Sequence, residues 1–341
     1  MSAPDYSALG FTVIRVSLDG AVLVVLMNRS KERNTWTADV PQQLQQVFDL
    51  ADRVRWLDTR AKVSGAGKLA ARETHSRDAL APRVNLNLTI YAQDDRVRVV
   101  VLTAEHTAPA FCAGAELTGG WDVLWSAEEE KEGPQAHRDA GGKTSLAIYR
   151  CRKLTVVAVN GHAAGVGLTG MQLPFDFRFV WAGAKLTFPF VRRGIVPEAI
   201  SSYLLPRLIG QSRASSLLLT GATFTPDSPL MAGLYHQILP TREEVFPAAL
   251  AFAKELAATT SQVSVAVAKG LIQNPGNSPE ENHLYDSRAM RALGGNADSV
   301  EGIDSFRERR APKFTATLGK DLGSWFPWWH QLSTKYRNAK L

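Results

Sequence analysis

Apolar residues alternate with polar ones near the start of the chain and follow a helical spacing soon afterwards. Residues 11–27 hold two alternating apolar runs on either side of Asp19-Gly20, and an Asp-Gly pair between such runs is typical of a β-hairpin. Residues 38–53 repeat apolar side chains at the i, i+3, i+4 spacing, which predicts an amphipathic helix. The chain is therefore expected to begin with a hairpin followed by a helix.

Three later apolar segments are continuous enough to be buried strands, at residues 95–104, 154–161 and 176–183. Stretches of helical character separate them, and strands that alternate with helices indicate a layered α/β fold. After about residue 277 the pattern becomes helical. No uninterrupted apolar run approaches the roughly 18 residues of a membrane-spanning helix, so we expect no membrane span.

The segment from residue 54 to residue 93 interrupts this alternation. The tetrapeptide Asp-Arg-Val-Arg stands at 52–55 and again at 95–98, so the helix would join the next strand directly if the segment were removed. The segment is rich in Arg, Ala and Ser, weakly periodic and long for a loop. We interpret 54–93 as a disordered insertion or a retained intron, with a genuine species-specific loop as the alternative.

Composition and charge exclude several classes of protein. The 341 residues are 45% hydrophobic and 21% charged, as in an ordinary globular protein. The net charge is +6, but residues 54–93 hold seven Lys/Arg against three Asp/Glu, which leaves +2 for the rest of the chain. We therefore expect no nucleic-acid partner. Cys112 and Cys151 are too few for a disulfide framework or a zinc site, so we expect buried thiols, a reducing compartment and no metal.

The two ends of the sequence bear on localisation. The N-terminus lacks the basic-then-apolar pattern of a signal peptide. The last three residues, Ala339-Lys340-Leu341, are a small-basic-Leu tripeptide of the peroxisome-import type. We expect a flexible tail over residues 331–341 that an import receptor recognises, and hence a peroxisomal protein.

Two glycine-bearing turns each follow a predicted buried strand. The first is "FCAGAEL", residues 111–117, and the second lies in "VVAVNGHAAGVGL", residues 156–168. Small residues let the backbone approach a ligand closely, and N–H groups that open a helix point outward unpaired. Two such groups aimed at one point form an oxyanion hole. A dinucleotide site would instead require a full G-x-G-x-x-G, which these turns lack.

These turns resemble the two signature segments of the crotonase superfamily, the enoyl-CoA hydratase/isomerase family. "MNRSKERNTW" resembles its N-terminal acyl-CoA loop, and "SPEENHLYDSRAMRALGGNADSVEGIDSFRERRAPKF" resembles its last helices. The likeness covers roughly residues 10–53 and 94–330. It implies an α/β fold with a crotonase-type ββα spiral core (1–53 plus 94–255), a C-terminal helical trimerisation region (256–330), and assembly as a homotrimer or hexamer.

The resemblance also implies an acyl-CoA substrate and no separate cofactor, because CoA is part of the substrate. The thioester enolate would be held by the backbone N–H groups of Ala115 and Val166. The two glutamates of the family's hydratases fall here on Thr169 and Phe190, so both acids are missing. Instead, "GIVPEAISS" resembles the active-site segment of peroxisomal-type Δ3,Δ2-enoyl-CoA isomerases, whose single base matches Glu198.

The chemistry of such an isomerase suits one carboxylate. Moving a double bond from C3 to C2 takes one proton from the α carbon and returns one at C4, which a single group can do as a shuttle. Apolar neighbours would raise the pKa of Glu198 and make it a stronger base.

Three alternatives stay open. Glu198 follows Pro197 and would suit the first turn of a helix. The chain could be a hydratase that activates water with Glu198. It could also be a non-catalytic or RNA-binding protein built on the same fold.

The resemblance places further residues around the substrate. Lys31 and Arg33 are candidate contacts for the CoA phosphates and adenine, and Lys313 and Phe314 are candidates to close over the nucleotide. The remaining candidates are Phe188 and Phe190, as walls of the acyl pocket or as core residues, and the turn residues Ala113, Gly114, Gly165 and Gly167.

Overall fold

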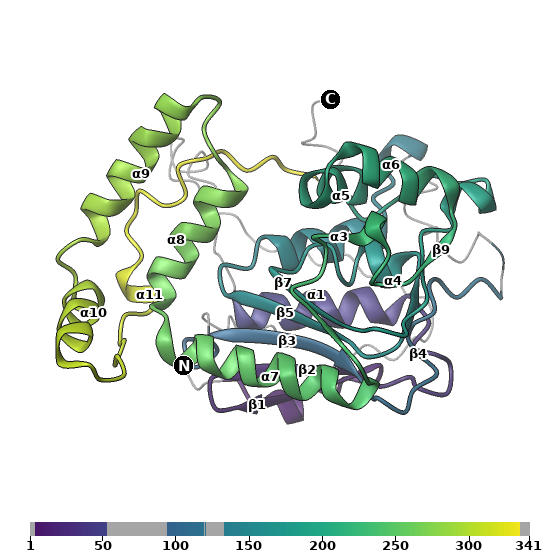
Figure 1. Ribbon diagram of the computed structural model, residues 1–341, viewed down its shortest axis with the longest axis horizontal. Coiled ribbons are helices and arrows are strands. Elements are labelled where there is room, and N and C mark those ends of the chain that lie inside the picture. Colours follow the sequence, from purple (N-terminus) through teal and green to yellow (C-terminus); the bar gives the residue numbers. More distant parts are fainter. Residues whose placement is uncertain (1–3, 53–93, 119, 121–132, 335–341) are drawn as a thin grey trace, which may run out of the picture.

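The computed structural model describes residues 4–52, 94–118, 120 and 133–334. In this part the chain forms two β-sheets flanked by helices, with a helical region that extends to one side (Figure 1). The predicted α/β fold is confirmed. The segment 54–93 and the import-type tripeptide lie outside the described residues.

The elements fall close to the ranges predicted from the apolar pattern. The strands are β1 (Ile14–Asp19), β2 (Val22–Met27), β3 (Val99–Ala104), β4 (Ala110–Cys112), β5 (Leu154–Val159), β6 (His162–Ala164), β7 (Phe177–Trp181), β8 (Leu186–Thr187), β9 (Thr223–Phe224) and β10 (Gln237–Leu239). The helices are α1 (Asp39–Ala51), α3 (Ala140–Tyr149), α4 (Val166–Thr169), α5 (Ser201–Ile209), α6 (Gln211–Thr220), α7 (Arg242–Thr259), α8 (Gln262–Gln273), α9 (Pro279–Leu293), α10 (Ala297–Glu308) and α11 (Leu318–Asp321).

The larger sheet has the strand order β1-β2-β3-β5-β7-β10. β1 and β2 are antiparallel and form the hairpin predicted around Asp19-Gly20. The other pairs of this sheet are parallel, and a parallel sheet buried on both faces explains why β3 and β5 are continuous apolar runs.

The smaller sheet has the strand order β4-β6-β8-β9. Together the two sheets show a repeating unit of two strands and a helical segment. β3, β5 and β7 of the larger sheet are followed by β4, β6 and β8 of the smaller one, and each pair then leads into a helical segment: α3, α4, and a 3-10 turn before α5. Three successive ββα units result. The ββα spiral core implied by the sequence resemblance is therefore present.

Alternate residues of β3 face opposite sides of the larger sheet. Val99 and Val101 pack with α7, which crosses one face of the sheet (Figure 1). Val100 and Leu102 belong to a larger core that contains the apolar residues of α1. This separation follows from the two-residue period of a strand. Because α1 also packs along α3, the start of α3 is held at a fixed place beside the core.

The C-terminal helices α8 to α11 project away from the sheets (Figure 1). α7 packs on the larger sheet as far as its buried residue Ala257, so the boundary expected at residue 255 falls inside this helix. The predicted helical region is present and begins with α8. Its role in trimerisation stays a prediction. In the described residues, no helix has both the length and the apolar character needed to cross a membrane.

Beyond α11 the chain turns back toward the core, and we call residues 325–334 the returning segment. Its aromatic side chains pack on one another and on α8, where a Cβ at Gly270 would lie 3.0 Å from the ring of Phe326. The Trp328 indole donates to the carbonyl oxygen of Asn274 at 3.3 Å. Arg138 donates to the carbonyl oxygen of Thr334 at 2.8 Å. The first residues of the expected tail are thus fixed against the body of the protein.

Candidate active site

The two glycine-bearing turns lie side by side because β4 and β6 are neighbouring strands. Cys112 pairs with Ala163 in the ladder. Gly114 has a φ of +97° and approaches the second turn so closely that a Cβ would lie 3.2 Å from the carbonyl oxygen of Ala164. A Cβ on Gly167 would lie 2.5 Å from the carbonyl oxygen of Cys112. The fold therefore brings the predicted turn residues together.

The bonds around Ala115 and the place of Val166 in α4 bear on the predicted oxyanion hole. Trp36 forms a parallel bridge with Ala115, in which Trp36 N–H donates to Gly114 O at 2.8 Å and Glu116 N–H donates to Trp36 O at 2.9 Å. The N–H of the middle residue, Ala115, then points away from Trp36. Val166 is the first residue of α4, and the opening N–H groups of a helix have no intrahelical acceptor. Both N–H groups can therefore donate to a ligand oxygen.

Glu198 lies before α5 rather than in its first turn. α5 begins at Ser201, whose N–H and hydroxyl donate to the backbone carbonyl of Glu198 at 3.1 and 2.6 Å. The Glu198 carboxylate instead accepts a hydrogen bond from the hydroxyl of Thr169, at the end of α4. This geometry contradicts the alternative in which Glu198 serves as an acid in the helix's first turn. Its side chain is directed to the ββα turns.

The backbone after Glu198 is strained and is held by a second carboxylate. Ala199 and Ile200 have φ values of +57° and +52°, a region that costs L-residues roughly 1–2 kcal/mol each. Asp139 accepts a hydrogen bond from the N–H of Ala199 at 3.1 Å, and it also caps α3 by accepting from the N–H of Gly142. One carboxylate thus ties the start of α3 to the turn that carries Glu198.

Asp139 is the site residue that sequence reasoning missed. An aspartate directly before a helix is a familiar N-cap signal, so its capping role was readable in the sequence. Its bond to Ala199 joins residues 60 positions apart, and no local pattern reports such a contact.

The pKa of Glu198 is raised from its ordinary value of 4.5 to about 8. The main cause is burial, which disfavours the charged form. The Thr169 hydrogen bond acts in the opposite direction, while the charge of Asp139 and a hydrogen bond to it raise the pKa further. Glu198 is therefore mostly protonated at neutral pH in the free protein and is a strong base once ionised.

The predicted CoA loop reaches the first turn. The carbonyl oxygen of Arg33 accepts a hydrogen bond from the N–H of Ala113 at 3.1 Å. Asn34 is fully buried, and its side-chain amide donates to the carbonyl of Ala110 at 3.0 Å. Lys31 and Arg33 are exposed, and the backbone of Arg33 adjoins the first turn.

The other predicted contacts divide into two groups. Phe190 is 5% exposed, and its ring lies 3.9 Å from where a Cβ on Gly165 would be, so it borders the second turn. Phe188 is fully buried in the main core. This agrees with the alternative interpretation, in which Phe188 is a core residue.

Lys313 and Phe314 do not join the turns in this chain. Lys313 donates its N–H to Glu301 of α10, and Phe314 accepts at its carbonyl from Arg98 at 2.6 Å. Both lie near α10 and α11, on the opposite side of the molecule from α4 (Figure 1). Their predicted contact with the nucleotide stays a prediction.

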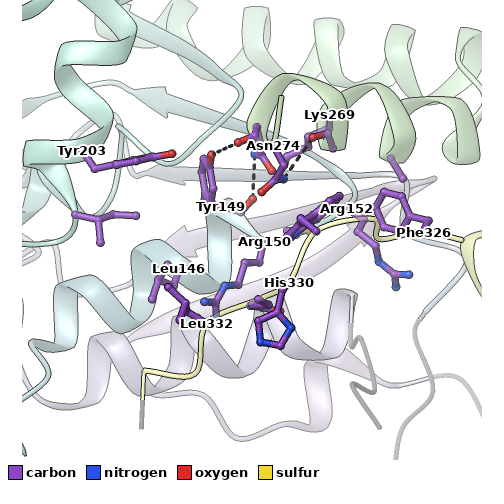
Figure 2. Close-up of a pocket in the computed structure, with 17 residues that line it drawn as sticks. Leu146, Tyr149, Arg150, Arg152, Tyr203, Lys269, Asn274, Phe326, His330 and Leu332 are labelled. Carbon is purple, nitrogen blue, oxygen red and sulfur yellow. Dashed lines mark hydrogen bonds between the residues drawn. The ribbon is translucent and has the colours of Figure 1, made fainter. Parts of the chain in front are cut away.

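A pocket of about 460 Å³ lies between α3, α5, α8 and the returning segment. Figure 2 shows Leu146 of α3 beside Leu332, with Tyr149 of α3, Tyr203 of α5 and Asn274 near the other end. Positions 142, 146 and 149 follow the i, i+4, i+7 spacing of one helix face. The lining does not include Glu198. The same face of α3 therefore runs from the Asp139 cap into the pocket.

The thiols and the acidic groups bear on metal chemistry. Cys112 and Cys151 are free and buried, as predicted, and burial raises the pKa of each thiol to about 12. Within the described ranges, no group of three or more His, Cys, Asp or Glu side chains is arranged to hold a metal ion.

Comparison with known proteins identifies the family. The sequence profile of the enoyl-CoA hydratase/isomerase family matches residues 83–317. Enoyl-CoA hydratase AFT3-1 of Alternaria alternata is 42% identical over 230 residues, which are 67% of this chain and 75% of that protein. The 1,2-epoxyphenylacetyl-CoA isomerase of Escherichia coli K12 is 30% identical over 235 residues, covering 65% of this chain and 83% of that protein.

Solved structures agree with this result. A probable enoyl-CoA hydratase/isomerase from Mycobacterium abscessus superimposes with a TM-score of 0.67 at 26% identity, covering 89% of this chain and 99% of that one. A protein from Streptomyces coelicolor described as an enoyl-CoA hydratase shares the fold with a TM-score of 0.70 at 21% identity, covering 92% of this chain and 97% of that one. This chain therefore belongs to the enoyl-CoA hydratase/isomerase family of the crotonase superfamily.

Proposed function

We propose that the protein is an enoyl-CoA isomerase that moves a double bond from C3 to C2 of an acyl-CoA thioester. The observation that carries this proposal is the Glu198 carboxyl, which is partly buried, has a pKa raised to about 8 and bonds to α4 directly after the second turn. A carboxylate with such a pKa is suited to take an α proton and to give it back.

The reaction follows from the positions of the donors and the base. The thioester oxygen accepts hydrogen bonds from the N–H groups of Ala115 and Val166, which stabilise negative charge there. Ionised Glu198 takes a proton from C2, and the electron pair of the broken C–H bond moves onto the thioester oxygen. The enolate then collapses through the C3–C4 double bond, C4 takes the proton from Glu198, and the 2-enoyl thioester remains.

The surroundings suit a long substrate. Lys31 and Arg33 offer positive charge for the CoA phosphates beside the first turn. The acyl chain would follow the face of α3 that leads to the pocket of about 460 Å³, whose walls include Leu146 and Leu332.

A second candidate function is the hydration of a 2-enoyl-CoA. Adding water across a double bond generally requires two groups to hold and activate the water, and Asp139 supplies a second carboxylate beside Glu198. The hydratase name of the Alternaria relative also favours this candidate.

One experiment separates the two candidates. The full-length protein and Glu198→Gln are given a 3-enoyl-CoA or a 2-enoyl-CoA, absorbance of the conjugated thioester is followed, and products are identified by mass. Conversion of the 3-enoyl substrate at unchanged mass, with a loss of at least about 100-fold in the variant, supports the isomerase. A gain of one water by the 2-enoyl substrate, with no reaction of the 3-enoyl substrate, supports the hydratase and rejects the isomerase.

A further inference from the structure

Asp139 and Glu198 form a pair of carboxylates at the start of α3. A Cβ built on Gly141 would lie 2.0 Å from Glu198 Oε2 and 3.2 Å from Asp139 Oδ1. The two oxygens are therefore no more than about 5 Å apart, which is within the range where one ionised carboxylate disfavours ionisation of the other. The absence of a side chain on Gly141 makes this approach possible.

The pair is held by the fold from both sides. Asp139 is fixed by the N–H groups of Gly142 and Ala199. Glu198 is fixed by the Thr169 hydroxyl and by the bonds from Ser201 to its backbone carbonyl. The positive φ of Ala199, a non-glycine residue, persists where the surrounding structure enforces it, and such strain concentrates at functional sites.

Three groups face Glu198 from the elements packed around it. They are Asp139 before α3, the Thr169 hydroxyl of α4 and the buried Cys112 thiol of β4. For the part of the chain that the structure describes, no Lys, Arg or His contributes to its pKa. Among these groups, the charge of Asp139 raises the pKa of Glu198, and burial raises the pKa of the Cys112 thiol to about 12.

We propose that Asp139 is a positioning residue that accepts a hydrogen bond from the protonated Glu198 carboxyl and holds the proton between its removal and its return. This role rests on the proposed function of Glu198 as the base. When Glu198 takes the C2 proton, a C–H bond breaks and an O–H bond forms. That O–H donates to Asp139 until C4 takes the proton, so no proton or electron is gained or lost overall.

Asp139 also makes Glu198 a stronger base. Its negative charge and its acceptor oxygens favour the protonated form of Glu198, and a stronger base removes an α proton faster when it is ionised. The cost of this arrangement is that Glu198 must lose its proton before the reaction, so activity should rise with pH.

The test is the pH dependence of kcat in Asp139→Asn. An asparagine oxygen can still accept from the N–H groups of Gly142 and Ala199, because asparagine caps helices as well as aspartate does. The substitution removes the charge and replaces the second carboxylate oxygen with an NH2 group, while Oδ1 keeps both backbone donors. The rising limb of the kcat profile should move to lower pH by at least about one unit and the plateau should fall about 10-fold, with KM unchanged.

A matched control is Asp298→Asn in α10. Asp298 is 3% exposed and accepts from the N–H groups of Thr315 and Ala316 at 2.8 and 3.0 Å, so it too is a buried structural carboxylate. This control should keep the wild-type pH profile. If Asp139→Asn also keeps it, Asp139 is only a helix cap and the proposal is overturned.

Glu198→Gln distinguishes this failure from failure of the proposed function. If Glu198→Gln retains wild-type activity, Glu198 is not the base and the proposed function fails as well. If Glu198→Gln is inactive and the Asp139→Asn profile is unshifted, only the role of Asp139 is rejected. Thermal unfolding as a function of pH gives a readout without substrate: in Asp139→Asn, the stability that depends on protonated Glu198 should be lost at lower pH than in wild type.

Discussion

Replacing Gly141 with alanine should abolish most activity while leaving the fold intact. The new Cβ would lie 2.0 Å from Glu198 Oε2 and 3.1 Å from the Cβ of Ala199. Carbon–oxygen contacts are normally no shorter than about 3.3 Å. The Glu198 carboxylate must therefore move by about 1 Å or more, away from the position between Thr169 and Asp139.

The two effects of this substitution differ in size. A displacement of about 1 Å of a catalytic group lowers the rate about 100-fold. The free energy of unfolding should change by less than about 1 kcal/mol, because alanine favours the helix over glycine by up to about 1 kcal/mol and the main clash is with the end of a flexible side chain. Loss of kcat without loss of stability is the expected signature.

The assay pairs turnover of a 3-enoyl-CoA with thermal unfolding followed by circular dichroism. Gly302→Ala is the matched control, because it also adds a methyl group to a helix and its Cβ would meet nothing closer than 3.7 Å. The control should keep the wild-type kcat. A Gly141→Ala protein with full kcat and an unchanged melting temperature would refute the placement of Glu198 as the base next to Gly141.

Three further predictions follow from the same geometry. Ala199→Gly should raise the free energy of unfolding by about 1 kcal/mol, measured by urea denaturation, since glycine adopts a φ of +57° without strain. The raised pKa of Glu198 means that its protonated form contributes stability that is complete below about pH 4.5 and lost as the pH rises through about 8. Glu198→Gln should thus match wild type at pH 4 and be more stable at pH 9, on the order of 3 kcal/mol; equal stabilities at pH 9 would contradict the raised pKa. Asn34→Ala should lower the free energy of unfolding by about 2 kcal/mol and raise KM for the CoA thioester more than it lowers kcat. The reason is that Asn34 bonds to both Arg29 and Ala110 and so holds the Lys31–Arg33 loop. An unchanged KM would reject that role for the loop.

Local patterns in the sequence predicted the helices and strands because the burial of apolar side chains determines both the sequence pattern and the element that carries it. The helix expected over 38–53 is α1 (Asp39–Ala51), and the three expected strands are β3, β5 and β7. The Asp19-Gly20 turn joins β1 to β2 as predicted, since the residues of a tight turn must satisfy its backbone angles wherever it occurs.

The start of α5 could not be read in the same way. Pro197-Glu198 suggested a first helical turn, whereas α5 begins at Ser201. The delay arises from Ala199 and Ile200, which adopt positive φ values although neither is glycine. Their conformation is imposed by tertiary contacts, above all the bond from Ala199 to Asp139, and single-residue preferences do not report such contacts.

The number of acids in a sequence is therefore a weak guide to the reaction. Both hydratase positions lack a glutamate, yet folding brings Asp139 to Glu198 and gives the site two carboxylates. The residue that borders the second turn is a better criterion for choosing between hydration and isomerisation. The family resemblance assigns Phe190 to the position of one missing acid, and its almost fully buried ring lies near Gly165. An apolar ring offers no hydrogen bond to a water that must be held for attack, whereas a proton shuttle needs no such water. Phe190 thus supports the proposed isomerisation, in which the carboxylate pair would hold one proton between its removal from C2 and its return at C4.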